Sequence, residues 1–292
     1  MLLASRAGYL RIVQLLLNNK ADPDTKGAIH DIEATALWQA SEYNHPRLVE
    51  ELSAAGASLN TPAYVKWDDV RHKTLQTPLF RFCTRTSARA DVDTRLLYVL
   101  IKYKADVNLA ESLHGRTPLM NAAWHGSDWL IRTLLDARAN PDLAEADGGT
   151  ALSDAAYQNH ASSLQLLLYA QANPNFVDEK GMTALHYASA KGHAEVVRSL
   201  LSSPILTKPN LRVQGRSPLD LARMSRSLLT DANIRKTFSE SDRKLLGWCH
   251  GLQDIKAKKH HHHQQQQIIE EGKEEEARSK NSDKRKAETE SE

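Results

Sequence analysis

The chain has 292 residues, of which 41% are hydrophobic and 25% charged, and its formal net charge is +2 at pH 7. Basic and acidic residues nearly balance, so bulk electrostatics do not favour nucleic acid or another polyanionic partner. The two cysteines, Cys83 and Cys249, exclude a disulfide scaffold and fit a reducing compartment, so we expect a cytoplasmic protein.

The N-terminal run M-L-L-A-S-R-A-G-Y-L-R-I-V-Q-L-L-L predicts two short helices that meet at Gly8. It has no basic leading region and is interrupted by Arg6 and Arg11, which argues against a signal peptide. No segment approaches 18 uninterrupted apolar residues, so we expect no membrane span. Its leucines leave this end apolar, which indicates either an imperfect cap or the C-terminal part of a longer chain.

A helix–loop–helix pattern recurs along the chain and is clearest from Lys180 to Leu201. There Thr183 is the predicted N-cap of a first helix, and Gly192 ends that helix because glycine tolerates left-handed geometry. The capping residues of successive units, Thr117, Thr150, Thr183 and Ser217, are spaced by 33, 33 and 34 positions. Two helices this short cannot enclose a core alone, so neighbouring units must stack.

The accompanying motifs are T-P-L-M-N-A-A from Thr117, T-A-L-S-D-A-A from Thr150, and the turns A-D-V-N at Ala105, A-N-P-D at Ala139 and A-N-P-N at Ala172. With the period, they resemble the ankyrin repeat family over roughly residues 1–225. The resemblance implies an all-α fold class: a curved right-handed solenoid of six to seven helix-turn-helix units joined by β-hairpin-like turns. Beyond it we expect a disordered C-terminal tail.

We expect the repeat array to span residues 1–231, with repeats near 1–24, 35–60, 77–108, 117–142, 150–175, 183–210 and 217–231. Residues 232–259 are predicted to form a C-terminal capping helical segment. Residues 260–292 begin with H-H-H-H and Q-Q-Q-Q and continue with Lys-, Glu- and Ser-rich sequence, which predicts a disordered low-complexity tail. Its basic cluster at 284–286 could contribute to nuclear import, although such clusters are more often simply solvated.

Repeat three departs from the pattern twice. The turn before it, residues 61–76, is much longer than the other turns, and the loop between its two helices is also extended. Insertions in repeat arrays fall in loops, often on the binding face. The turn is therefore a candidate binding element, and sequence drift is the alternative.

The resemblance implies a concave wall, formed by the first helices and the turns, that binds partners. Ten residues map to this wall and are our candidate partner-binding residues: Tyr43, Tyr64, Trp67, Arg85, His114, Arg116, Trp124, His125, Tyr157 and Lys191. Tyrosine, tryptophan and arginine most often dominate interface energies. The alternative is that Trp124 and Tyr157 only pack on neighbouring helices. Trp129 maps instead to an exposed position of a second helix, where it could cover the next repeat.

The sequence contains no clear catalytic motif: it has no phosphate-binding glycine loop, no triad and no closed set of metal ligands. The resemblance implies that His45, His160, His186 and His193 bond backbone groups between repeats. We therefore expect a non-enzymatic, monomeric scaffold or adaptor that binds another protein, with no cofactor, metal, nucleic acid or membrane. The alternative is a regulatory or targeting segment of a larger enzyme or signalling protein truncated at its N-terminus.

Overall fold

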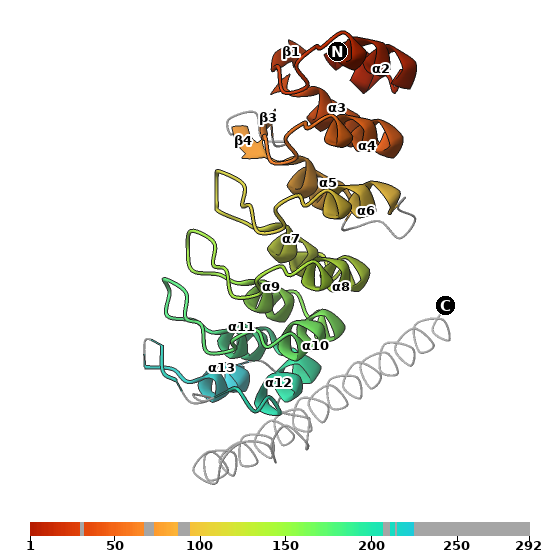
Figure 1. Cartoon of the computed structure of the whole chain (residues 1–292). Coiled ribbons are helices and arrows are strands. Elements are labelled where there is room, and N and C mark those ends of the chain that lie inside the picture. The colour runs from red at the N-terminus through yellow and green to blue at the C-terminus, as the bar shows by residue number, and fades with distance from the viewer. Residues whose placement is uncertain (30–31, 67–72, 87–93, 207–210, 214, 225–292) are drawn as a thin grey trace, which may run out of the picture. The chain divides into compact units, whose positions relative to one another are not determined.

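The computed structural model describes residues 1–29, 32–66, 73–86, 94–206, 211–213 and 215–224. These residues form a stack of helix pairs in which the turns lie on one side of the first helices and the second helices on the other (Figure 1). They all belong to a unit of residues 1–237, and the second unit, residues 238–292, lies outside the described residues. The predicted capping segment and tail lie outside them as well.

The helices alternate along the chain between the two layers of the stack. The first helices are α1 (Leu2–Arg6), α3 (Ala36–Glu42), α5 (Pro78–Thr86), α7 (Pro118–Trp124), α9 (Ala151–Tyr157), α11 (Ala184–Lys191) and α13 (Pro218–Met224). The second helices are α2 (Leu10–Asn18), α4 (Pro46–Ala54), α6 (Arg95–Lys102), α8 (Asp128–Asp136), α10 (Ala161–Tyr169) and α12 (Ala194–Leu201). The mostly helical repeat fold is thus confirmed.

Threonine caps begin α7, α9 and α11 as predicted. The hydroxyl oxygen of Thr183 accepts a hydrogen bond of 3.4 Å from the backbone N–H of His186, three residues into α11. Thr150 caps α9 in the same way. This bond satisfies one of the first-turn amides that a helix cannot satisfy itself. Gly192 ends α11 with φ 81°, in the left-handed region expected for it.

Two of the turns contain antiparallel strand pairs. Strand β1 (Gly27–Ile29) pairs with β2 (Ile32–Ala34), and β3 (Ala63–Lys66) pairs with β4 (Lys73–Gln76). The two ends of the long turn at 61–76 therefore form a regular antiparallel strand pair. Ala63 and Val65 are buried against Trp38, whose indole N–H donates a hydrogen bond of 2.9 Å to the carbonyl oxygen of Gln76. Successive residues of a strand point to opposite faces, which is why Ala63 and Val65 are buried while Tyr64 between them is exposed.

Each layer is held by apolar side chains buried between successive repeats. First helices pack on first helices from α1 to α13, and second helices pack on second helices except at α6 and α8, which touch only weakly. Leu134 of α8 and Leu200 of α12 are fully buried, with 0% exposure, as the predicted stacking requires. Their neighbours Leu135 and Leu201 are only partly buried.

Histidines that precede the second helices link successive repeats through hydrogen bonds to the backbone. Their Nε2 atoms lie near carbonyl oxygens of the preceding repeat: 3.0 Å for His45 and Arg6, 3.1 Å for His160 and Trp124, and 3.1 Å for His193 and Tyr157. The buried His186 makes a similar contact of 2.9 Å with the carbonyl oxygen of Leu211. The structural role expected of these histidines is confirmed, and two of the bonds fix the backbone of Trp124 and Tyr157.

Candidate functional site

Two candidate residues end the first helices of successive repeats: Trp124 is the last residue of α7, and Tyr157 is the last residue of α9. Because they hold the same position in the repeat, their rings stack, with centroids 5.8 Å apart and planes inclined by 15°. Tyr187 of α11 adds a third ring, edge-on to Tyr157 with the centroids 5.7 Å apart. Both arrangements are favourable for aromatic pairs. We call Trp124, Tyr157 and Tyr187 the aromatic cluster.

Two basic side chains lie on the faces of this cluster. The guanidinium carbon of Arg116 is 5.5 Å from the ring centroid of Trp124, and the Lys191 ammonium is 4.2 Å from that of Tyr157. Cations at this distance are attracted by the ring quadrupole. The structure therefore brings together Arg116, Trp124, Tyr157 and Lys191, and His125 lies next to Trp124 in the chain. Burial, with a contribution from the charge of Arg116, lowers the pKa of His125.

Arg116 is held by two carboxylates of the next repeat. Its Nη1 donates a hydrogen bond of 2.8 Å to Glu145, and its Nη2 donates one of 2.5 Å to Asp154. Burial opposes the positive charge of Arg116, but the charges of Asp154 and Glu145 outweigh burial and raise the pKa of the guanidinium. Only 17% of the side chain is exposed. The main role of Arg116 is therefore to link two repeats, and little of its surface is accessible to a partner.

Asp154 lies in α9 with its carboxyl almost enclosed. Burial raises the pKa of Asp154 to about 7; Arg116 opposes this rise, whereas Glu145 and Asp147 add to it. Near neutral pH the carboxyl therefore exists in both the charged and the neutral form. Its charge depends on which cations lie beside it.

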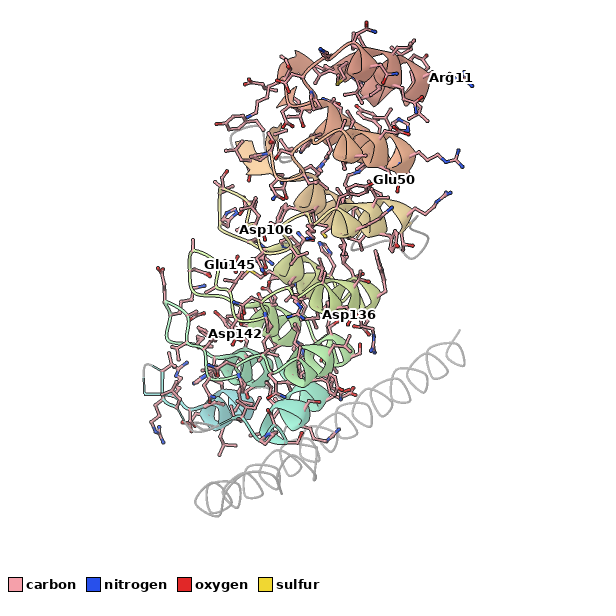
Figure 2. The ribbon with its side chains drawn as sticks, in the orientation of Figure 1. Arg11, Glu50, Asp106, Asp136, Asp142 and Glu145 are labelled. Carbon is pink, nitrogen blue, oxygen red and sulfur yellow. The ribbon has the colours of Figure 1, made fainter. Side chains whose placement is uncertain are left out.

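A pocket of about 190 Å³ lies between the aromatic cluster and the turns that precede α9 and α11. Its lining consists of the three aromatic rings together with Glu145, Asp147, Gly149, Ser153, Asp154, Asp178 and Lys180. Figure 2 shows Glu145 on the turn side of the stack, whereas Asp136 lies on the side of the second helices. The pocket thus combines aromatic surface with several carboxylates.

The turns around this pocket are tied to one another by backbone hydrogen bonds. The N–H of Glu179 donates to the carbonyl oxygen of Asp147 at 2.9 Å, and the N–H of Ala146 donates to that of His114 at 2.7 Å. Gly148 permits this close approach, because it has φ 85° and an added Cβ would lie 2.9 Å from the Asp178 Cα. The carboxylates of adjacent turns are consequently held in fixed relative positions.

Two further candidates lie among charged residues nearer the N-terminus. Tyr43 is 45% exposed and carries the guanidinium of Arg6 over its ring at 5.0 Å. Arg85 lies 3.5 Å from the carboxylate of Glu42 and donates a hydrogen bond to the Glu42 carbonyl oxygen. Neither candidate contacts the aromatic cluster, so both belong to a separate part of the same helix layer.

The remaining candidates lie in turns. Tyr64 of β3 is 46% exposed. His114 has a largely exposed side chain in the turn before α7, and Trp67 lies outside the described residues. Glu111 organises the turn of His114: burial opposes its ionisation, but hydrogen bonds from Thr74 and from backbone amides outweigh burial and lower the pKa of Glu111.

Sequence reasoning missed the acidic side of the pocket and Tyr187. The candidates were taken from the ends of the first helices and from the turns, whereas Asp154 and Tyr187 both stand four residues after the capping threonine of their repeats, one helical turn before the helix end. Glu145 and Asp178 both stand five residues before the capping threonine. The recurrence of these two positions in successive repeats is the sequence signal that could have identified the acidic side of the pocket and Tyr187.

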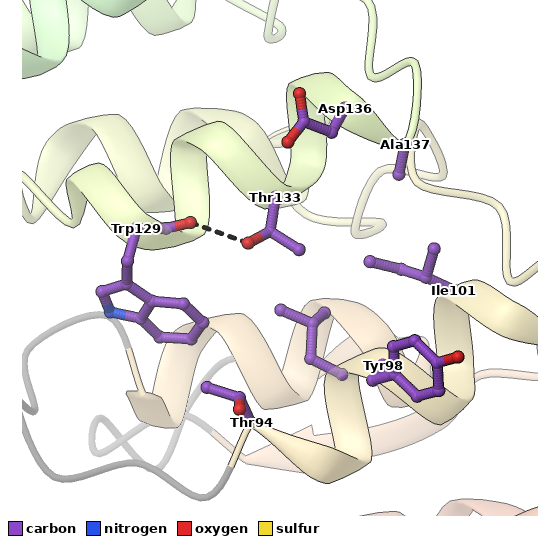
Figure 3. Close-up of a pocket in the computed structure, with 8 residues that line it drawn as sticks. Thr94, Tyr98, Ile101, Trp129, Thr133, Asp136 and Ala137 are labelled. Atoms are coloured by element: carbon purple, nitrogen blue, oxygen red, sulfur yellow. Dashed lines mark hydrogen bonds between the residues drawn. The ribbon is translucent and has the colours of Figure 1, made fainter.

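A second pocket, of about 410 Å³, lies on the opposite layer between α6 and α8, where the second helices touch only weakly (Figure 3). Its lining includes Leu97, Tyr98, Ile101 and Trp129. The expectation that Trp129 is exposed and covers the next repeat is wrong. Trp129 is partly buried and faces α6 of the preceding repeat, because that helix leaves a gap beside it.

The described residues contain no group of three or more histidine, cysteine, aspartate or glutamate side chains placed to hold a metal ion. Burial raises the pKa of the Cys83 thiol, which disfavours the thiolate that a nucleophile needs. Within the same residues no helix has the length and apolar character required to cross a bilayer.

Comparison with known proteins gives a consistent result. A family model described as ankyrin repeats, in three copies, matches residues 152–235, and a model of a single ankyrin repeat matches residues 1–28. The crystal structure of the ankyrin repeat domain of Bcl-3, described as a unique member of the IkappaB protein family, matches with a TM-score of 0.64 and 25% identity. The match covers 80% of this chain and 96% of that one. No curated protein matches the sequence significantly.

Proposed function

Because the chain belongs to the ankyrin repeat proteins, we propose that it is a protein–protein interaction scaffold or adaptor that binds a partner across its first helices and turns. Ankyrin repeat domains generally bind proteins and are typically non-catalytic. We place the centre of binding at the aromatic cluster, and we propose no catalytic role.

The observation that supports this placement is the exposure of Trp124. The side chain of Trp124 remains 37% exposed although it stacks on Tyr157 and carries Arg116 on its face. A tryptophan that is already held in place loses little conformational freedom when a partner covers it. Tryptophan, tyrosine and arginine are also the residues most often found at interface hot spots.

The other candidate residues would extend this surface. Lys191 and His125 lie beside the aromatic cluster, and His114 lies in the adjoining turn. Tyr43, Tyr64, Arg85 and Trp67 would contribute if the partner reached the N-terminal repeats. We propose that these four contribute less, because the described ones among them do not contact the aromatic cluster.

Affinity capture followed by titration calorimetry tests the proposal. We expect Trp124→Ala to weaken binding of a captured partner by more than about 1 kcal/mol. The matched control is Tyr169→Ala, which removes an aromatic side chain that is 88% exposed at the end of α10. Equal affinity for both variants would place the partner elsewhere.

The alternative role for Trp124 and Tyr157 is packing alone. Under that alternative, Trp124→Ala would lower the thermal unfolding midpoint and leave the affinity for the partner unchanged. Under the proposal, affinity falls and the midpoint changes much less. Thermal unfolding of the same two variants therefore distinguishes the two roles.

A second candidate function is regulation or targeting within a larger enzyme or signalling protein. It is favoured by the apolar surface of α1 and α2, where Leu3 is 72%, Ile12 47% and Leu15 62% exposed. An end face of this kind suits coverage by further protein. A longer transcript that encodes additional in-frame sequence would support this function, and its absence would favour the scaffold.

A further inference from the structure

The pocket beside the aromatic cluster has more carboxylates than cations. Glu145, Asp147, Asp154 and Asp178 line it, together with the single lysine Lys180. Arg116 pairs with Glu145 and Asp154, and Lys191 lies over Tyr157, so four carboxyl groups are accompanied by three basic side chains. Within the described part of the chain, Asp147 and Asp178 take part in no ion pair.

Carboxylate oxygens of two pocket residues remain available as acceptors. Asp147 uses Oδ1 for the N–H of Gly149, and Glu145 uses Oε2 for Arg116. Among the described residues, the second oxygen of each of these carboxylates accepts no hydrogen bond. The acceptors lie on elements that backbone hydrogen bonds hold in place, so they are preorganised.

Asp178 has a different role in the pocket. It accepts hydrogen bonds from the backbone N–H groups of Lys180 and Met182 through Oδ1 and from the hydroxyl of Tyr187 through Oδ2. These bonds fix the carboxylate and position the third ring of the aromatic cluster. Asp178 therefore contributes negative charge to the pocket and places Tyr187.

We propose that this pocket receives an arginine side chain from a basic segment of the partner protein. The inference rests on the proposed function and specifies the chemistry of its partner. A guanidinium is planar, packs against aromatic rings and offers its N–H donors in a fork that matches carboxylates. Aromatic rings and available carboxylate oxygens occur together here.

The protein already uses this chemistry next to the pocket. Arg116 lies over Trp124 while it donates hydrogen bonds to Glu145 and Asp154. The partner's arginine would combine the same two kinds of contact, with the aromatic rings and the carboxylates that line the pocket. The excess of carboxylates supplies the charge complementarity, and it disfavours a phosphate-bearing ligand.

The test is an NMR titration of the full chain with N-acetyl-arginine methylamide. The control ligand is N-acetyl-citrulline methylamide, which has nearly the same shape and no charge. We expect the indole N–H resonance of Trp124 to shift saturably with the arginine probe, and affinity for the citrulline probe to be about tenfold lower. Equal affinities for the two probes, or no saturable shift, would overturn the inference.

A pair of variants localises the effect. Asp147→Asn keeps an oxygen for the N–H of Gly149 and removes one charge, and we expect it to weaken the arginine probe about threefold. Asp136→Asn removes an exposed charge on α8, at the other pocket, and should leave the affinity unchanged. An unchanged affinity in Asp147→Asn would contradict the assignment.

The inference and the proposed function fail in different ways. Suppose that Trp124→Ala abolishes capture of a partner, while replacing each arginine of that partner's binding segment by glutamine has no effect. The proposed function then stands and the arginine pocket is wrong. If instead the arginine probe binds saturably and Trp124→Ala has no effect on partner capture, the arginine pocket stands and the proposed binding centre is wrong.

Discussion

Asp154 links the stability of the repeat stack to pH. Burial is the main reason that its pKa is about 7 in the folded chain, whereas an aspartate in an unfolded chain has a pKa of about 3.9. Between these values the folded state binds more protons than the unfolded state. The contribution of Asp154 to the free energy of unfolding therefore falls as pH rises from about 4 to about 7.

Asp154→Asn tests this linkage. The asparagine keeps an oxygen for the hydrogen bond from Arg116 and no longer titrates. We expect the free energy of unfolding, measured by urea titration at pH 5, 6 and 7, to fall less steeply with pH in the variant. The two slopes should differ by at most about 1.4 kcal/mol per pH unit. Parallel curves would mean that Asp154 stays ionised throughout, and Asp136→Asn is the control for loss of a surface carboxyl.

The helices of the second layer owe their positions to one buried face. Leu134 is fully buried between repeats, whereas Leu135 beside it on α8 is partly exposed. We expect Leu134→Ala to lower the free energy of unfolding by about 2–5 kcal/mol, because it leaves a cavity between repeats. Leu135→Ala makes the same chemical change at a partly exposed position and should cost clearly less. Equal losses in denaturant titration would contradict the stacking register.

The repeat elements could be predicted from sequence because their signals are local. The capping threonines, Gly192 and the spacing of leucines each reflect a rule that acts within a few residues. The same locality explains why Trp124 and Tyr157 were found: equal positions in successive repeats must lie side by side. Prediction was weaker in the long turn, where the pairing of β3 with β4 depends on packing against Trp38.

The candidate site was predicted only in part, because its acidic side depends on contacts between repeats. Arg116 was predicted to be a partner-binding turn residue, but Glu145 and Asp154 of the next repeat pair with its guanidinium, and only 17% of its side chain is exposed. The gap between α6 and α8 that receives Trp129 was also invisible in the sequence. Both features depend on how closely neighbouring repeats approach, which a period of about 33 residues does not specify.

The stack is held together almost entirely by contacts between neighbouring repeats. In the described part of the chain, the first helices from α3 to α11 each pack on the first helices before and after them, and α1 and α2 have neighbours on one side only. Stability in such an array is approximately a sum of repeat and interface contributions, so its ends can open without the middle. The aromatic cluster lies in repeats with neighbours on both sides, where local opening costs most.

Val13→Ala tests whether the stack opens locally. Val13 is the fully buried residue of α2, and its truncation should cost about 1–2 kcal/mol. We expect hydrogen exchange to accelerate in α1 and α2, to change little in α8 to α10, and partner binding at the aromatic cluster to persist. Leu134→Ala, in contrast, should accelerate exchange in the repeats on both sides of α8. If Val13→Ala accelerated exchange equally in every helix, the array would unfold as one cooperative unit, and a defect at its end would then weaken the central binding site as well.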